Sequence, residues 1–197
     1  ASHGAAIGII IAMYLYRKRV LDKPVLWVLD RIVLPVASGA IFVRIGNFMN
    51  SEIIGKVTNS DYGFRFIQQH YRAQEAVQLT SITNVSKAYD AIANNSKFTT
   101  LLEAVPLRHP AQLYESICYV FVFAILMFVY WKTDKKQKPF YLFGLFLVLL
   151  WSVRFVVEFY KKSQGGFEDA LGGILSTGQW LSIPFIIIGL YFMFRKT

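Results

Sequence analysis

Residues 32–48, with the sequence IVLPVASGAIFVRIGNF, are apolar along nearly their whole length, and Arg44 is their one charged residue. Amide side chains follow it at Asn47 and Asn50. A bilayer interior offers a charged group no water, and an arginine at the centre of a membrane helix costs about 2.5–3.5 kcal/mol on insertion scales. A charge that is kept there usually faces a polar cavity. The segment therefore predicts a membrane helix that ends in a functional site.

Helical spacing brings the polar residues of this segment together. Arg44, Asn47 and Asn50 are three residues apart and share one face of a helix. Glu52 and Gly55 follow where the apolar run ends. A guanidinium presents a planar fork of donors that suits a phosphate, and amides can complete the shell. The alternative is an interfacial arginine that pairs with Glu52.

Composition and segment length place the chain among membrane proteins. Of its 197 residues, 55% are hydrophobic and 16% are aromatic, whereas soluble domains average about 45–50% apolar residues with glycine included. Five apolar segments stand out, at residues 4–16, 25–49, 113–131, 140–160 and 178–194. A spanning helix needs about 20 residues, so the first segment is short. We expect an all-α, polytopic membrane helical bundle with about five membrane segments.

The basic residues indicate how these segments are oriented. The net charge is +9, which in a soluble protein would suggest nucleic acid. Here the basic residues cluster after Tyr16, Trp131 and Phe194, at the ends of alternate crossings. The positive-inside rule puts these clusters in the cytoplasm and the Arg44 end on the outer side. We expect a membrane-embedded protein with no nucleic-acid partner.

The chain divides into three parts on this topology. Membrane helices with the signature arginine are expected over 1–50, a small outward-facing helical head over 51–112, and three membrane helices over 113–197. The single cysteine and three scattered histidines predict no disulfide and no metal site. The chain opens with Ala1-Ser2-His3-Gly4, and we expect it to begin within a longer protein.

Polar residues elsewhere in the chain gather on the same expected side. Arg154 and Glu158 are four residues apart on one helix, where they can pair. The pair is either a second cationic anchor or an internal ion pair that lets the helix insert. Residues 108–115, RHPAQLYE, fit a helix start or a functional role. His3 has a reference pKa of about 6.5 and is a candidate base.

The segment Arg44–Gly55, RIGNFMNSEIIG, resembles the signature of the bacterial prolipoprotein diacylglyceryl transferase family. The His3-Gly4 start, residues 108–115, the Arg154 helix and residues 178–184 agree with that family in order, so the resemblance covers essentially the whole chain, as a C-terminal portion. The family transfers the diacylglyceryl group of phosphatidylglycerol to the lipobox cysteine thiol of a prolipoprotein. The resemblance implies an active site that contains His3, Arg44, Asn47, Glu52, Gly55, Arg154 and Glu158.

This resemblance implies an enzyme of the bacterial inner membrane, with its active site on the periplasmic side and no cofactor. His3, Arg44 and Arg154 are the expected catalytic residues. Arg44, Asn47, Asn50, Glu52, Gly55, Arg154 and Glu158 are expected to bind substrate. A transporter or flippase of anionic lipid would also place two arginines in a polar cavity, but it would move lipid without cleaving it. A membrane scaffold would explain the apolar content alone.

Overall fold

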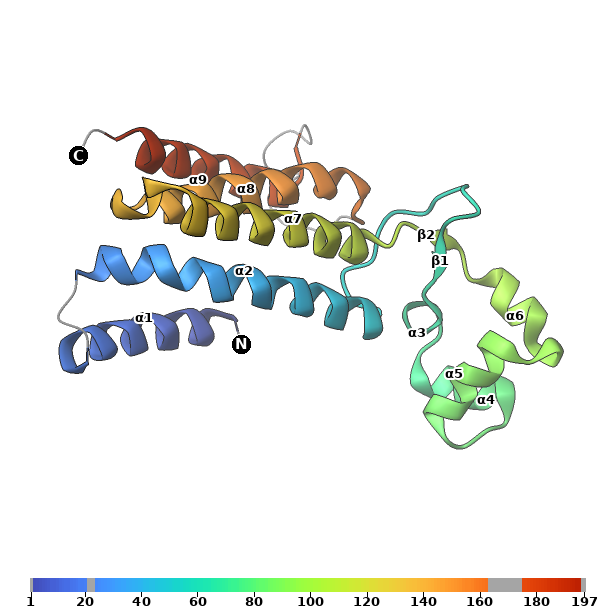
Figure 1. The fold of residues 1–197 in the computed structure, drawn as a ribbon. Coiled ribbons are helices and arrows are strands. Elements are labelled where there is room, and N and C mark those ends of the chain that lie inside the picture. Colours follow the sequence, from blue (N-terminus) through green and yellow to red (C-terminus); the bar gives the residue numbers. More distant parts are fainter. Residues whose placement is uncertain (1, 21–23, 163–174, 196–197) are drawn as a thin grey trace.

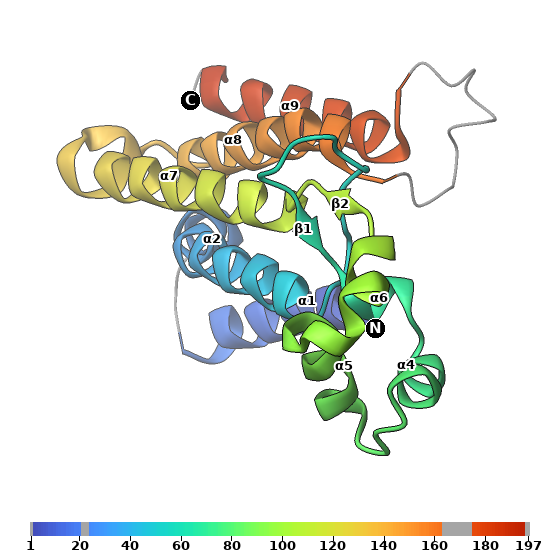
Figure 2. The same cartoon turned by 90° about the vertical axis from the view of Figure 1, so that its right-hand side faces the viewer.

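Long helices lie side by side in a bundle, with a smaller helical head at one end (Figure 1). The computed structural model describes residues 2–20, 24–162 and 175–195. The bundle contains α1 (Ser2–Arg19), α2 (Val25–Met49), α7 (Ala111–Lys132), α8 (Tyr141–Val157) and α9 (Thr177–Phe194). They are stacked in the order α1, α2, α7, α8, α9, and the view from the head end shows the same order (Figure 2).

Four of the described helices are long and apolar enough to span a membrane: Trp27–Met49, Ala111–Lys132, Tyr141–Tyr160 and Thr177–Phe194. The expectation of about five segments was therefore too high by one. Helix α1 forms, but Arg17, Lys18 and Arg19 fill its last turn and shorten its apolar stretch. Outward-facing side chains such as Phe42, Phe121 and Phe128 are 62–68% exposed. This distribution suits a bundle surrounded by lipid.

The bundle core is built by α2, α7 and α8. Its buried residues are Val33, Ala37, Tyr119, Val122, Leu126, Leu142, Phe146 and Leu147. Helices α8 and α9 approach closely through Gly144 and Gly189, since a Cβ on either residue would lie 2.6–2.7 Å from the carbonyl oxygen of the other. Small residues at such a crossing allow two membrane helices to pack backbone against backbone.

The carboxylate of Asp30, in α2, holds the start of α8. Asp30 is 2% exposed and accepts hydrogen bonds from the backbone N–H groups of Phe140, at 2.7 Å, and Phe143, at 2.9 Å. These groups belong to the N-terminal turn of a helix, which has no intrahelical acceptors for them. A short 3-10 helix, η2 (Asp134–Gln137), joins α7 to α8 on the same side of the bundle.

The head lies between α2 and α7 in sequence. It contains β1 (Phe64–Arg65), α3 (Ile67–His70), α4 (Ala73–Thr80), α5 (Val85–Asn94), η1 (Ser96–Phe98), α6 (Thr99–Ala104) and β2 (Leu107–Arg108). Strands β1 and β2 pair antiparallel and bring the two ends of the head together. Tyr71, Ala76, Ala88, Ile92 and Val105 form a separate small core. The predicted short helices are confirmed.

Candidate active site

Arg44 is held by a carboxylate from a neighbouring helix. Its Nε atom lies 2.5 Å from Oε2 of Glu115, in α7, and the two side chains are 11% and 0% exposed. With its amide oriented to satisfy both of its groups, Asn47 accepts a hydrogen bond from Arg44 Nη1 and donates one to the Val43 carbonyl, both at 3.0 Å. The alternative pairing of Arg44 with Glu52 is therefore wrong, because Glu115 takes that place.

Glu115 also binds a second cation. Its Oε1 atom accepts a hydrogen bond of 2.8 Å from the Nζ of Lys161, and that Nζ lies 3.6 Å from Oε2 of Glu158. Lys161 is 6% exposed and Glu158 is 15% exposed. We call Arg44, Glu115, Lys161 and Glu158 the ion network. Its two positive and two negative charges balance, which offsets part of the desolvation cost of burying them at the end of a membrane bundle.

Arg154 lies one turn before Glu158 but is bound differently from what its spacing predicts. The described ion pairs join Glu158 to Lys161 and not to Arg154. The Arg154 guanidinium lies 5.2 Å from the centre of the Trp151 ring, and its buried Nε has no hydrogen-bond partner among the described residues. The predicted Arg154–Glu158 pair is therefore wrong, because Glu158 turns to the lysine three residues ahead. Arg154 is left as a cation with unused donor capacity.

A buried tyrosine, Tyr119, lies on the same face of α7 as Glu115. It lies one turn after Glu115 on α7 and is 2% exposed. The two arginines that the sequence singled out are 110 residues apart in the chain, yet both belong beside the ion network: Arg44 is part of it, and Arg154 lies one turn before Glu158.

The end of the signature segment is closed by backbone contacts. The Gly55 N–H donates to the His109 carbonyl at 3.1 Å, and the Gly55 carbonyl accepts from Arg108 Nη1 at 3.3 Å. A Cβ on Gly55 would lie 2.2 Å from the His109 carbonyl oxygen, so a side chain does not fit there. The Lys56 N–H donates to the carbonyl of Tyr160, in η3 (Glu158–Tyr160), at 2.8 Å. These contacts join the segment to the residues just before α7 and to the end of η3.

Helix α9 begins against Glu158. A Cβ on Gly178 would lie 2.5–2.6 Å from the atoms of the Glu158 carboxyl group, so the glycine lets the helix start approach it. The side chains of Ser176 and Gln179 form a capping box at this start, and Gln179 also donates to the Phe155 carbonyl at 3.4 Å. The positive end of the α9 dipole thus faces a carboxylate.

Two further predicted site residues, Asn50 and Glu52, lie outside the ion network, and the side chain of a third, His3, is not described. Asn50 is exposed and ends α2, where its N–H donates to Gly46 at 2.9 Å. Glu52 is exposed, and its backbone carbonyl accepts a hydrogen bond from Gln112 Nε2. His3 lies in the first turn of α1, and its side chain falls outside what the structure describes. Since α1 runs antiparallel to α2, that turn points toward the end at which α2 finishes (Figure 1).

Sequence reasoning missed Glu115 and Lys161 as site residues. Glu115 ends the RHPAQLYE segment, which was weighed as a helix start, and its exposed fraction of 0% could not be read from that pattern. Lys161 carries a sequence signal of its own, because it opposes the positive-inside rule at its end of the membrane helix. Here that cation has a buried partner, the carboxylate of Glu115.

A helical bundle with four membrane-capable segments and buried, paired charges at one end defines a polytopic membrane protein with a polar site. The sequence profile of the prolipoprotein diacylglyceryl transferase family matches residues 1–195, and the chain belongs to this family.

Several similar proteins carry the name phosphatidylglycerol–prolipoprotein diacylglyceryl transferase. The one from Tolumonas auensis is 35% identical over 193 residues, which are 98% of this chain and 60% of the relative. The one from Bacteroides fragilis is 40% identical over 194 residues, 98% of this chain and 57% of the relative. The one from Porphyromonas gingivalis is 38% identical over 200 residues, 99% of this chain and 61% of the relative. The chain thus spans about three fifths of the length of these relatives.

Proposed function

We propose that the protein transfers the diacylglyceryl group of phosphatidylglycerol to the lipobox cysteine thiol of prolipoproteins, the first step of lipoprotein maturation. The observation that carries this proposal is that Arg44 is buried and fixed by Glu115, while Arg154, one turn before Glu158 of the ion network, has a buried Nε with no partner among the described residues. Family membership and the names of the relatives support the substrates. The proposal places the protein in the bacterial inner membrane, with the ion network toward the periplasm.

The reaction replaces a carbon–oxygen bond by a carbon–sulfur bond. The cysteine sulfur attacks the carbon of the diacylated glycerol unit that is bonded to the phosphate oxygen, and a thioether forms. The other glycerol unit leaves as glycerol phosphate with the electron pair of the broken carbon–oxygen bond. The thiol, with a reference pKa of about 8.5, must give up its proton. His3 is the base that we propose for this proton. No step requires a metal ion or a nucleotide.

The arginines would stabilise the charge of the departing phosphate. The buried Nε of Arg154 has no partner among the described residues, so Arg154 is the better placed of the two to bind the phosphate directly. Arg44 is fixed by Glu115 and Asn47, and such fixed donors stabilise developing charge without reorganising at the moment of reaction. Glu115 would act as a positioning residue because it holds Arg44, and Lys161 would do so because it fixes the Glu115 carboxylate from the other side.

The other residues that the sequence predicts for the site have supporting roles in this proposal. Asn47 is a positioning residue of Arg44, and Glu158 holds Lys161 and the start of α9. Gly55 allows the close approach of two backbone segments at the edge of the site. Asn50 and Glu52 are exposed at the end of α2, where they could contact a headgroup or the signal peptide.

The test is transfer in a defined membrane. The purified protein is placed in vesicles of phosphatidylglycerol and given a lipobox peptide, and the peptide is weighed by mass spectrometry while glycerol phosphate is measured in the water phase. We expect the peptide to gain one diacylglyceryl group for each glycerol phosphate released, and a peptide with serine in place of cysteine to gain none. Movement of the lipid between leaflets without either product would favour the transporter instead.

A further inference from the structure

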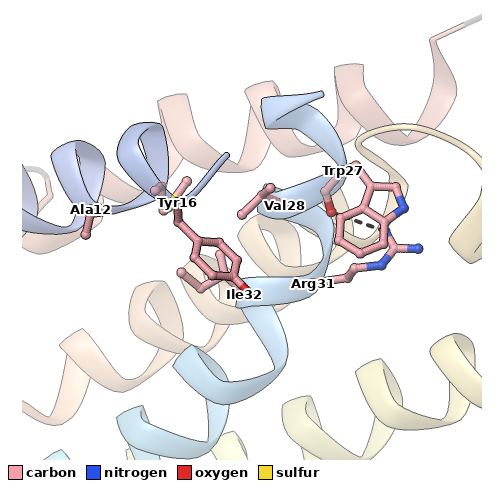
Figure 3. Close-up of a pocket in the computed structure, with 7 residues that line it drawn as sticks. Ala12, Tyr16, Trp27, Val28, Arg31 and Ile32 are labelled. Atoms are coloured by element: carbon pink, nitrogen blue, oxygen red, sulfur yellow. Dashed lines mark hydrogen bonds between the residues drawn. The ribbon is translucent and has the colours of Figure 1, made fainter. Parts of the chain in front are cut away.

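A pocket of about 680 Å³ lies between α1 and α2, where α1 ends and α2 begins. Its lining consists of Ala12, Met13, Tyr16, Trp27, Val28, Arg31 and Ile32 (Figure 3). The volume falls within the about 300–1,000 Å³ that is usual for ligand sites. The ion network lies where α2 ends, so the pocket is at the opposite end of the bundle (Figure 1).

The pocket combines apolar walls with a cationic rim. Tyr16 extends from α1 toward Val28 and Ile32, and Arg31 lies beside the Trp27 ring (Figure 3). The Arg31 guanidinium is 3.6 Å from the centre of that ring, and its Nη1 donates to the Trp27 carbonyl at 3.1 Å. The described ion pairs do not include Arg31. The charge is therefore held in a fixed place, and within the described part of the chain one side-chain hydrogen bond of Arg31 is seen, out of the five N–H donors of a guanidinium.

The surroundings of the pocket favour a negatively charged occupant. The same end of the bundle carries Lys18, Arg19, Lys132, Lys135, Lys136, Lys138 and Arg195. The carboxylate of Asp30 is already taken by the N–H groups that start α8. Tryptophan and tyrosine side chains are typical of the headgroup level of a bilayer, and clustered cations attract anionic lipids to that level.

We propose that this pocket binds an anionic phospholipid, with an acyl chain against Ala12, Met13, Val28 and Ile32 and the phosphate at Arg31. The lipid would sit in the leaflet opposite the one that the ion network faces, so it is a second lipid site and not the place where the donor reacts. The proposal does not depend on the transfer reaction, because it rests on the lining and charge of this pocket alone.

Quenching of Trp27 fluorescence by brominated acyl chains tests the proposal. Trp131, Trp151 and Trp180 are replaced by phenylalanine, so that Trp27 is the reporter within this chain. The protein is placed in phosphatidylcholine bilayers that contain the same small fraction of either brominated phosphatidylglycerol or brominated phosphatidylcholine. We expect severalfold stronger quenching by the anionic lipid. Equal quenching by both lipids, or none by either because protein fills the pocket, would overturn the proposal.

Two variants and a control make the test specific. Arg31→Gln should abolish the preference for the anionic lipid, and Ala12→Phe should reduce quenching by both lipids because it fills the pocket. Lys18→Gln removes the same charge from an exposed position outside the lining and should keep the preference. Comparing the two lipids within each variant cancels any change in the intrinsic fluorescence of Trp27. An undiminished preference in Arg31→Gln, or undiminished quenching by both lipids in Ala12→Phe, would refute the assignment.

Discussion

The two ends of the bundle use cationic side chains in opposite ways. Where α2 ends, Arg44 and Lys161 are 11% and 6% exposed and share the fully buried carboxylate of Glu115. Where α2 begins, cations such as Lys18, Lys132 and Lys135 are exposed. The same residue types therefore mark a site at one end and a membrane surface at the other. What separates the two is whether a carboxylate within the packed interior binds them.

Stability alone does not account for the buried network. A buried ion pair is often no better for stability than well-packed apolar residues, whereas removing one partner leaves an uncompensated charge and is costly. The network brings together α2, α7 and the segment that follows α8, so it fixes three elements around Arg44. A fixed array of charges is what the proposed transfer, with its departing phosphate, requires.

Of the substitutions that test the difference between the two ends, Glu115→Gln should have the largest effect on stability and activity. It leaves Arg44 and Lys161 without their shared carboxylate, and breaking a buried pair costs about 3–5 kcal/mol. We expect a large fall in the unfolding temperature in detergent and loss of peptide lipidation. Glu103→Gln, at an exposed position of the head, is the matched control and should change neither. A Glu115→Gln protein with normal stability would show that water or lipid compensates the two cations.

Arg44→Lys tests whether geometry or charge matters at the site end. Lysine keeps the positive charge but loses the planar fork that reaches Glu115 and Asn47 together. We expect lipidation to slow tenfold or more, which corresponds to about 1.4 kcal/mol or more in the barrier. Arg19→Lys, at the exposed end of α1, should leave the rate unchanged. Near-normal lipidation by the Arg44→Lys protein would mean that a point charge suffices.

Double-mutant cycles should show which of its two cationic neighbours, Lys161 or Arg154, Glu158 is energetically coupled to. Glu158 lies 3.6 Å from Lys161 and has no described ion pair with Arg154. We expect Glu158→Gln and Lys161→Met to be non-additive in stability, by about 0.5–3 kcal/mol as for residues in contact. Glu158→Gln and Arg154→Met should be closer to additive. A larger coupling energy for Glu158 with Arg154 than with Lys161 would instead support the i,i+4 ion pair that the sequence spacing predicts.

The sequence predicted the membrane helices and singled out the two arginines, but it did not predict which residues bind them. The apolar runs predicted the spanning helices, because lipid demands long apolar segments whatever their neighbours are. It also singled out Arg44 and Arg154, since charges in such runs are rare. Glu115 and Lys161 escaped, because their importance depends on which helices touch. The spacing of Arg154 and Glu158 misled for the same reason: Lys161 competes for the carboxylate.

Charge removal at the basic end should have the smallest effect. Lys132 and Lys135 are exposed, and Lys135 makes only a distant contact, 5.5 Å from the Tyr141 ring centre. Surface substitutions of this kind usually change stability by less than about 0.5 kcal/mol. We expect Lys132→Gln and Lys135→Gln, alone and together, to keep both the unfolding temperature and the lipidation rate.

Lys132→Gln and Lys135→Gln are best compared with Lys161→Gln, which removes the same positive charge from the opposite end of the bundle. It strips Glu115 of one of its two cations and should lower both stability and lipidation. The remaining basic residues near Lys132, including Lys136 and Lys138, preserve the charge bias that orients the helices. If the double variant at the basic end lost as much activity as Lys161→Gln, burial and pairing would not be what distinguishes the two ends.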